Sequence, residues 1–160
     1  MPHILSRPIL GRYGFNCGST LALSDGAAQV AAKVAFTTTI APACSCLVTV
    51  VLSKLILGYY DLSLSLNGIL AGLVSITAGG SVVQPWHASV IGVVGGIVMF
   101  CMHFLILKMR IDDPCDACVV HGFAGIWGLL APGIFCTDAN VQYAAYPNVN
   151  NSCGRGMRSP

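Results

Sequence analysis

The chain has 160 residues, of which 55% are hydrophobic and only 9% are charged, whereas about 25% of the residues in an average soluble domain are charged. This composition excludes an ordinary water-soluble domain. The formal net charge is +2, from eight Lys and Arg and six Asp and Glu. That charge is too small and too dispersed for a nucleic-acid-binding surface, so nucleic acid is excluded as a partner.

Three long stretches carry no Asp, Glu, Lys or Arg: residues 34–53, 62–107 and 117–137. A transmembrane helix needs about 20 mostly apolar residues, so the first and third stretches fit one span each and the middle stretch fits two. Gly79, Gly80 and Pro85 divide the middle stretch. The predicted fold over residues 1–160 is an all-α, polytopic transmembrane bundle of four full spans and one truncated span. The predicted helices cover about 9–23, 34–57, 66–78, 88–108 and 114–135.

The composition becomes polar and rich in Asn after Phe135, which predicts a polar loop over 136–160. Lys and Arg residues prefer the cytoplasmic loops of a membrane protein. Their excess on one side of the predicted spans places the N-terminus in the cytoplasm and the 136–160 loop outside it. That side carries Arg7, Arg12, Lys54, Lys108 and Arg110, and the opposite side carries Lys33, Arg155 and Arg158.

Small residues recur at helical spacing in every predicted span except the second. Helices associate in a bilayer through such residues, because they let two backbones approach closely. The pattern therefore predicts a packed bundle, but it identifies no substrate. The glycines are Gly14 and Gly18, Gly68 and Gly72, Gly92 and Gly96, and Gly122, Gly125 and Gly128.

His121 is the strongest candidate for a functional side chain, because ionisable groups inside a membrane are rare and usually face the bundle interior or a pore. The glycines that follow it would leave open space beside the imidazole. A structural role for a buried histidine stays open as well. We assign His87 and His103 to interfacial or structural roles. Asp113, Pro114 and Asp116 suit the entry of the last helix, where carboxylates offset unpaired N–H groups and proline fits the first turn.

Cys115, Cys118 and His121 together suggest a metal site as an alternative, but zinc sites usually need four ligands and no second pair has ligand spacing. Four of the eight cysteines, Cys17, Cys44, Cys46 and Cys101, fit the role of small buried hydrophobes. Only Cys136 and Cys153, which flank the predicted outer loop, could pair in an oxidising compartment. No motif implies a cofactor, and no catalytic carboxylate pair is needed, so we do not expect an enzyme.

Four motifs follow one another in the chain: GRYGFNCGS at 11–19, NGILAGLVSITAG at 67–79, PW at 85–86, and DDPCD at 112–116, which leads to VHG at 120–122. In this order they resemble the ammonium transporter (Amt/Rh) family. The resemblance implies a fold of eleven spans with an inverted repeat and a homotrimer with one pore per subunit. By motif order, the chain looks like about the sixth to the tenth span, so we expect a fragment.

For function, the resemblance implies transport of ammonium or ammonia across a membrane, most naturally the plasma membrane. Phe15 matches a gate phenylalanine, Ser19 a hydroxyl at the outer recruitment site, and His121 the second pore histidine. The recruitment tryptophan of the family falls at Arg12, where a fixed positive charge disfavours a cation. Half of an inverted repeat does not enclose a pore. A non-conducting membrane protein that packs against full-length transporter subunits is therefore the alternative function.

Overall fold

The computed structural model describes residues 10–11, 14–19 and 27–144, and every regular element within those ranges is a helix. Three stretches are long and apolar enough to cross a membrane: Ala27–Leu57, Pro85–Lys108 and Cys118–Phe135. The predicted all-α polytopic bundle is therefore confirmed. The elements in chain order are α2 (Ala27–Leu57), α3 (Leu62–Thr77), α4 (Pro85–Lys108), the π-helix η1 (Cys118–Phe123), α5 (Ala124–Phe135) and α6 (Asp138–Tyr143).

One of the four predicted full spans, 66–78, corresponds to a helix that is shorter than a bilayer crossing. Helix α3 has 16 residues, which gives a length of about 24 Å against a hydrocarbon core of about 30 Å. It begins at Leu62 because the Asp61 side chain accepts a hydrogen bond from the Leu64 N–H at 3.1 Å. Helix α4 begins at Pro85, a position where the missing N–H of proline costs nothing.

Helix α2 begins at Ala27, earlier than the predicted start at 34, because the charge of Lys33 does not interrupt it. The Lys33 Nζ donates to Ser81 O at 3.1 Å and to Asn140 Oδ1 at 2.8 Å. It also lies 5.4 Å from the centre of the Tyr143 ring. Lysine can bury its stem while its ammonium group finds polar partners at a helix end, so a charge inside this span is tolerated.

The structure describes the two ends of the chain only in part. Of the predicted helix 9–23, residues 10–11 and 14–18 are described as helical. Asn16 Nδ2 donates to Thr38 Oγ1 on α2 at 3.1 Å. The predicted 136–160 loop contains the short helix α6, and residues 145–160 lie outside the described part. Cys136 is disulfide-bonded, while Cys153, its predicted partner, also lies outside the described residues.

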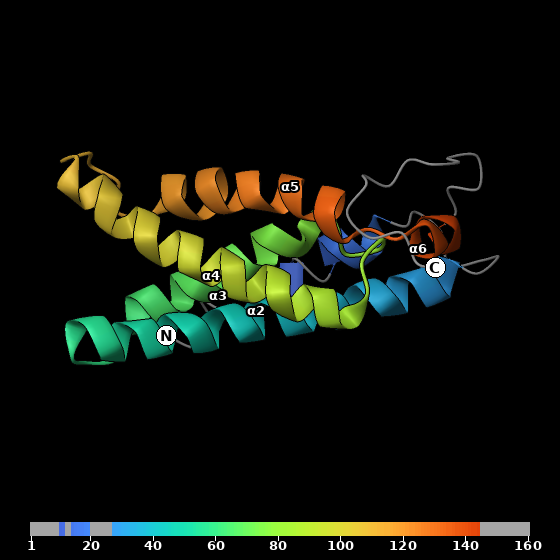
Figure 1. The fold of residues 1–160 in the computed structure, drawn as a ribbon, viewed down its shortest axis with the longest axis horizontal. Coiled ribbons are helices and arrows are strands. Elements are labelled where there is room, and N and C mark those ends of the chain that lie inside the picture. Colours follow the sequence, from blue (N-terminus) through green and yellow to red (C-terminus); the bar gives the residue numbers. More distant parts are fainter. Residues whose placement is uncertain (1–9, 12–13, 20–26, 145–160) are drawn as a thin grey trace.

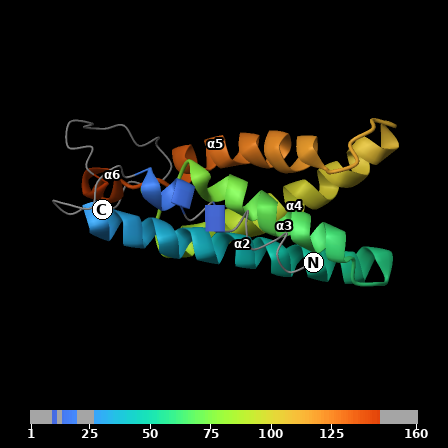
Figure 2. The ribbon, with the colours of Figure 1, turned by 180° about the vertical axis from the view of Figure 1, so that it is seen from behind.

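The helices run roughly along one axis, with α2 and α5 on opposite sides and α3 and α4 between them (Figure 1). The view from behind shows the same order (Figure 2). Connections 58–61 and 109–117 lie at one end of the bundle, which we call the Asp116 end. Connection 78–84 and α6 lie at the other, the α6 end. The long α2 therefore packs against α3 and α4, and α5 packs against the other side of both.

A surface of small residues on α2 receives the glycines of α3 and α4. A Cβ atom added at Gly72 would lie 2.6 Å from Pro42 Cα, and one added at Gly96 would lie 2.9 Å from Ser45 O. Ser45 also donates to Gly68 O at 2.6 Å. Helix α2, the predicted span without a glycine seam, thus supplies Ala41, Ser45 and Thr49 at a spacing of four residues. Apolar side chains gain little free energy by moving from lipid into the bundle, because lipid tails are equally apolar. The close packing of the helix backbones therefore stabilises the bundle.

Candidate functional site

His121 lies on an open groove of about 380 Å³ between α3 and the helix formed by η1 and α5. The imidazole is exposed in this chain. Apolar side chains make up most of the groove wall, so His121 and Thr77 are its polar side chains. The lining residues are Val74, Thr77, Ala78, His121, Gly122, Gly125, Ile126, Gly128 and Leu129.

The three glycines after His121 have two different roles. Gly122 and Gly125 line the groove, and a Cβ atom at either position would meet only one atom, at 3.8 Å. At Gly128 a Cβ atom would lie 3.0 Å from Ser75 Cα and from the carbonyl oxygens of Val74 and Ser75. Gly128 therefore lets α5 approach α3, while Gly122 and Gly125 leave space beside the imidazole.

His121 is part of a π-helical segment rather than a regular α-helix. Ala124 N–H donates to Val119 O, a bond to the fifth residue before it, and η1 covers Cys118–Phe123. Ser75 on α3 donates to Ala124 O at 3.4 Å. Single π-helical turns inside α-helices are uncommon and frequently occur at functional sites. The predicted regular helix 114–135 is therefore interrupted at the residue that carries the proposed chemistry.

Asp113 lies at the start of this helix and accepts hydrogen bonds from two backbone N–H groups. Its Oδ1 accepts from Ala117 N–H at 2.9 Å and its Oδ2 from Cys118 N–H at 2.8 Å. Such bonds satisfy N–H groups that have no partner within the helix. Pro114 is in the turn before the helix, not in its first turn as predicted, because the helix begins after Asp116.

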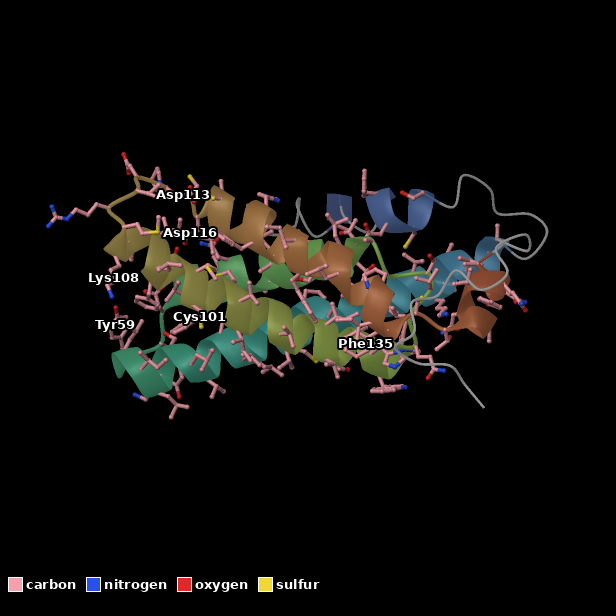
Figure 3. All side chains as sticks on the ribbon, turned by 45° about the horizontal axis from the view of Figure 1, so that its top comes forward. Tyr59, Cys101, Lys108, Asp113, Asp116 and Phe135 are labelled. Carbon is pink, nitrogen blue, oxygen red and sulfur yellow. The ribbon has the colours of Figure 1, made fainter. Side chains whose placement is uncertain are left out.

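Asp116 connects three elements at the Asp116 end. Its Oδ2 accepts from Asn67 Nδ2 on α3 at 2.7 Å, and its Oδ1 lies 2.7 Å from His103 Nδ1 on α4. Figure 3 shows Asp113 and Asp116 at the end opposite Phe135. The sequence indicated a helix-entry role for Asp116 but not its two partners, Asn67 and His103. Their signal was an amide side chain in α3 and an imidazole in the last half of α4, both within stretches free of Asp, Glu, Lys and Arg.

His87 is a buried packing residue at the α6 end. It is 1% exposed, and its Nδ1 accepts a hydrogen bond from Gln84 N–H at 3.2 Å. Its ring lies 5.2 Å from the Phe135 ring, measured between centroids. This bond closes the capping box at the start of α4.

Phe15 and Ser19 are not brought together with His121. Neither is among the described residues that line the groove. Phe15 is 61% exposed, and the Ser19 hydroxyl donates to Phe15 O at 2.6 Å. Their roles as gate and recruitment residues therefore stay predictions from the resemblance.

The metal alternative is not supported by the geometry. Within the described ranges, no three His, Cys, Asp or Glu side chains come together as ligands, so Cys115, Cys118 and His121 do not form the suggested set. Asp113 instead accepts hydrogen bonds from the helix backbone, at Ala117 and Cys118.

Residues 9–157 match the model of the Ammonium Transporter Family. The chain belongs to this family. It is 34% identical to ammonium transporter 3 of Dictyostelium discoideum, covering 81% of this chain and 30% of that one. It is 37% identical to the ammonium transporter Amt2 of Archaeoglobus fulgidus, over 84% of this chain and 28% of that one. The crystal structure of Mep2 from Saccharomyces cerevisiae superimposes with a TM-score of 0.81 at 31% identity, covering 91% of this chain and 31% of that one.

This ammonium transporter family member thus spans about 30% of the length of the relatives that it matches. Its three helices of membrane-spanning length and its family make it an integral membrane protein. The groove that carries His121 is open on one side in these residues.

Proposed function

We propose that the chain contributes part of a pathway for ammonium or ammonia across a membrane, and that His121 lines this pathway. The observation that carries the proposal is the position of the imidazole on the groove between α3 and α5, beside two glycines that leave it accessible. We propose ammonium or ammonia as the substrate because the relatives that the chain matches are named ammonium transporters.

The chemistry of the groove suits a small neutral amine better than a hydrated ion. Its walls are largely apolar, so a cation would lose water there without gaining enough polar partners. A neutral ammonia molecule loses less on desolvation. The imidazole of His121 offers it a hydrogen-bond donor or acceptor, and the only other polar side chain of the groove, Thr77, already donates its hydroxyl hydrogen to Leu73 O at 2.7 Å. The proposed pathway therefore requires that ammonium loses a proton before it enters the groove. This is a transport function, and we propose no enzymatic reaction.

We further propose that the Asp116 end faces the cytoplasm. Lys54, Lys108 and Arg110 lie at this end, whereas Lys33 lies at the α6 end, and basic residues favour the cytoplasmic side. This agrees with a cytoplasmic N-terminus. The family resemblance adds the plasma membrane as the location, a homotrimer as the assembly and one membrane domain over residues 1–160. Phe15 and Ser19 keep their proposed gate and recruitment roles.

A chimera tests the proposal without requiring that the chain conduct alone. Residues 27–144 replace the matching segment of a full-length relative, and growth on limiting ammonium is measured in cells without their own ammonium transporters. The chimera should support growth. His121→Ala in the chimera should lower uptake by about fivefold, because one hydrogen bond of about 1 kcal/mol along the pathway is lost. The matched control is Cys101→Ala, which removes an exposed side chain outside the groove and should leave uptake unchanged.

Two results would contradict the proposed function. One is a chimera that reaches the membrane in normal amounts but supports no growth. The other is equal uptake by the parent chimera and its His121→Ala variant.

A second function, as a non-conducting partner of full-length subunits, is favoured by one observation. In the described chain no atom lies within 4 Å of the positions that Cβ atoms would take at Gly14 and Gly18, so this seam is open to another helix. Such a protein would co-purify with a full-length relative and add no ammonium flux to it.

A further inference from the structure

The start of η1 is held from two neighbouring helices by one carboxylate. Asp116 is bonded to Asn67 of α3 at 2.7 Å and lies 2.7 Å from His103 of α4. The side chains of His103 and Asp116 are 20% and 13% exposed. We call Asn67, His103 and Asp116 the Asp116 cluster. It fixes the point at which the chain enters the helix that carries His121.

The backbone of Asp116 transmits this position to His121. Asp116 has a φ of 52°, a left-handed conformation that Asp tolerates better than most residues. Its carbonyl accepts the Val120 N–H at 2.8 Å, one residue before His121. This bond joins Asp116 to η1, so a shift of Asp116 would be passed to the turn that contains His121.

The chemistry of the cluster determines which nitrogen of His103 carries a proton. An ionised carboxylate only accepts hydrogen bonds. The Nδ1 atom of His103, which faces Asp116 Oδ1, must then be the donor. In a neutral ring this places the proton on Nδ1 and leaves Nε2 unprotonated.

We propose that His103 is a positioning residue for the pathway. Its Nδ1–H holds Asp116, and Asp116 sets the rotation of η1 that directs His121 into the groove. This inference rests on the proposed role of His121. Its readouts, however, are properties of the two imidazole rings, and they require no transport.

The test is ¹⁵N nuclear magnetic resonance on the full 160-residue chain with ¹⁵N-labelled histidine in lipid bilayers. In the parent chain, His103 should show a protonated Nδ1. The variant His103→Ala should move the imidazole resonances of His121. The variant His103→Asn should leave them in place, because the Asn Nδ2 donates from nearly the same position as Nδ1 of histidine. Cys101→Ala, two residues before His103 on α4 and exposed, is the matched control and should also leave them in place.

Three results would overturn the inference. They are an unprotonated Nδ1 on His103, unchanged His121 resonances in His103→Ala, and a His103→Asn variant that behaves like His103→Ala. The resonances of the buried His87 report whether each variant remains folded. If His103→Ala does not fold, the protonation of Nδ1 in the parent and the His121 resonances of His103→Asn still decide the question. If the chimera supports no ammonium uptake while the histidine spectra are as expected, the proposed function is overturned and the inference about His103 is not.

Discussion

Replacing Gly92 with leucine is expected to destabilise the bundle by more than about 3 kcal/mol, above the usual cost of overpacking. A Cβ atom at Gly92 would overlap the carbonyl group of Ala41 and would lie 2.8 Å from its Cα. Both groups belong to helix backbone, so neither can move aside without separating α2 from α4. The measurement is the free energy of unfolding, from a denaturant titration in mixed micelles.

Trp127 is the reporter for this titration, because its Nε1 donates to Ile91 O at 3.0 Å, beside Gly92. The control is Gly133→Leu on α5, where no described atom lies within 4 Å of the added Cβ position. Gly133→Leu should change the stability by less than about 1 kcal/mol, as substitutions away from packed sites do. Equal effects of the two substitutions would contradict the packing described for α2 and α4.

Replacing Asp116 with alanine should cost about 3 kcal/mol of stability, because it removes two hydrogen bonds to a carboxylate and leaves their donors without a partner. A further part of this cost comes from the φ of 52°, which alanine adopts less readily than Asp. Asp116→Asn should cost less, since asparagine tolerates this conformation and its oxygen can accept one of the two bonds. The free energy of unfolding is again the measured quantity.

Asp112→Ala is the matched control, because it removes an exposed carboxylate from the same connection. We expect a change of less than about 0.5 kcal/mol for this control. An Asp112→Ala variant as unstable as Asp116→Ala would mean that net charge, rather than the bonds to Asn67 and His103, sets the stability of the Asp116 end.

The sequence predicted the order and approximate positions of the four apolar helices after residue 26 because their signal is local. The absence of charge over about 20 residues requires no knowledge of tertiary contacts. The starts were less accurate, since Lys33 was read as a boundary although it lies within α2 and donates across the α6 end. Pro85 was read as part of a break, although proline is well suited to the first turn of a helix.

Within the site, the open space beside His121 was predicted from the spacing of the glycines that follow it in the sequence. The π-helical turn did not, because it depends on how the chain is held at Asp116 and at Ser75. The contacts of Asp116 with Asn67 and His103 join residues that are 49 and 13 positions apart. The sequence periodicity of a single helix cannot predict contacts between residues on different helices. The serine and threonine face of α2 was missed for a similar reason, since its role appears only when glycines of α3 and α4 lie against it.

The central claim is that His121 meets ammonium or ammonia in the groove between α3 and α5. Its most direct test is a titration of the ¹⁵N-histidine chain in lipid bilayers with ammonium chloride, at constant pH and with sodium chloride as the ionic control. The account predicts a saturable change in the His121 resonances and none in those of the buried His87. Unchanged His121 resonances, or the same change in His87, would contradict it.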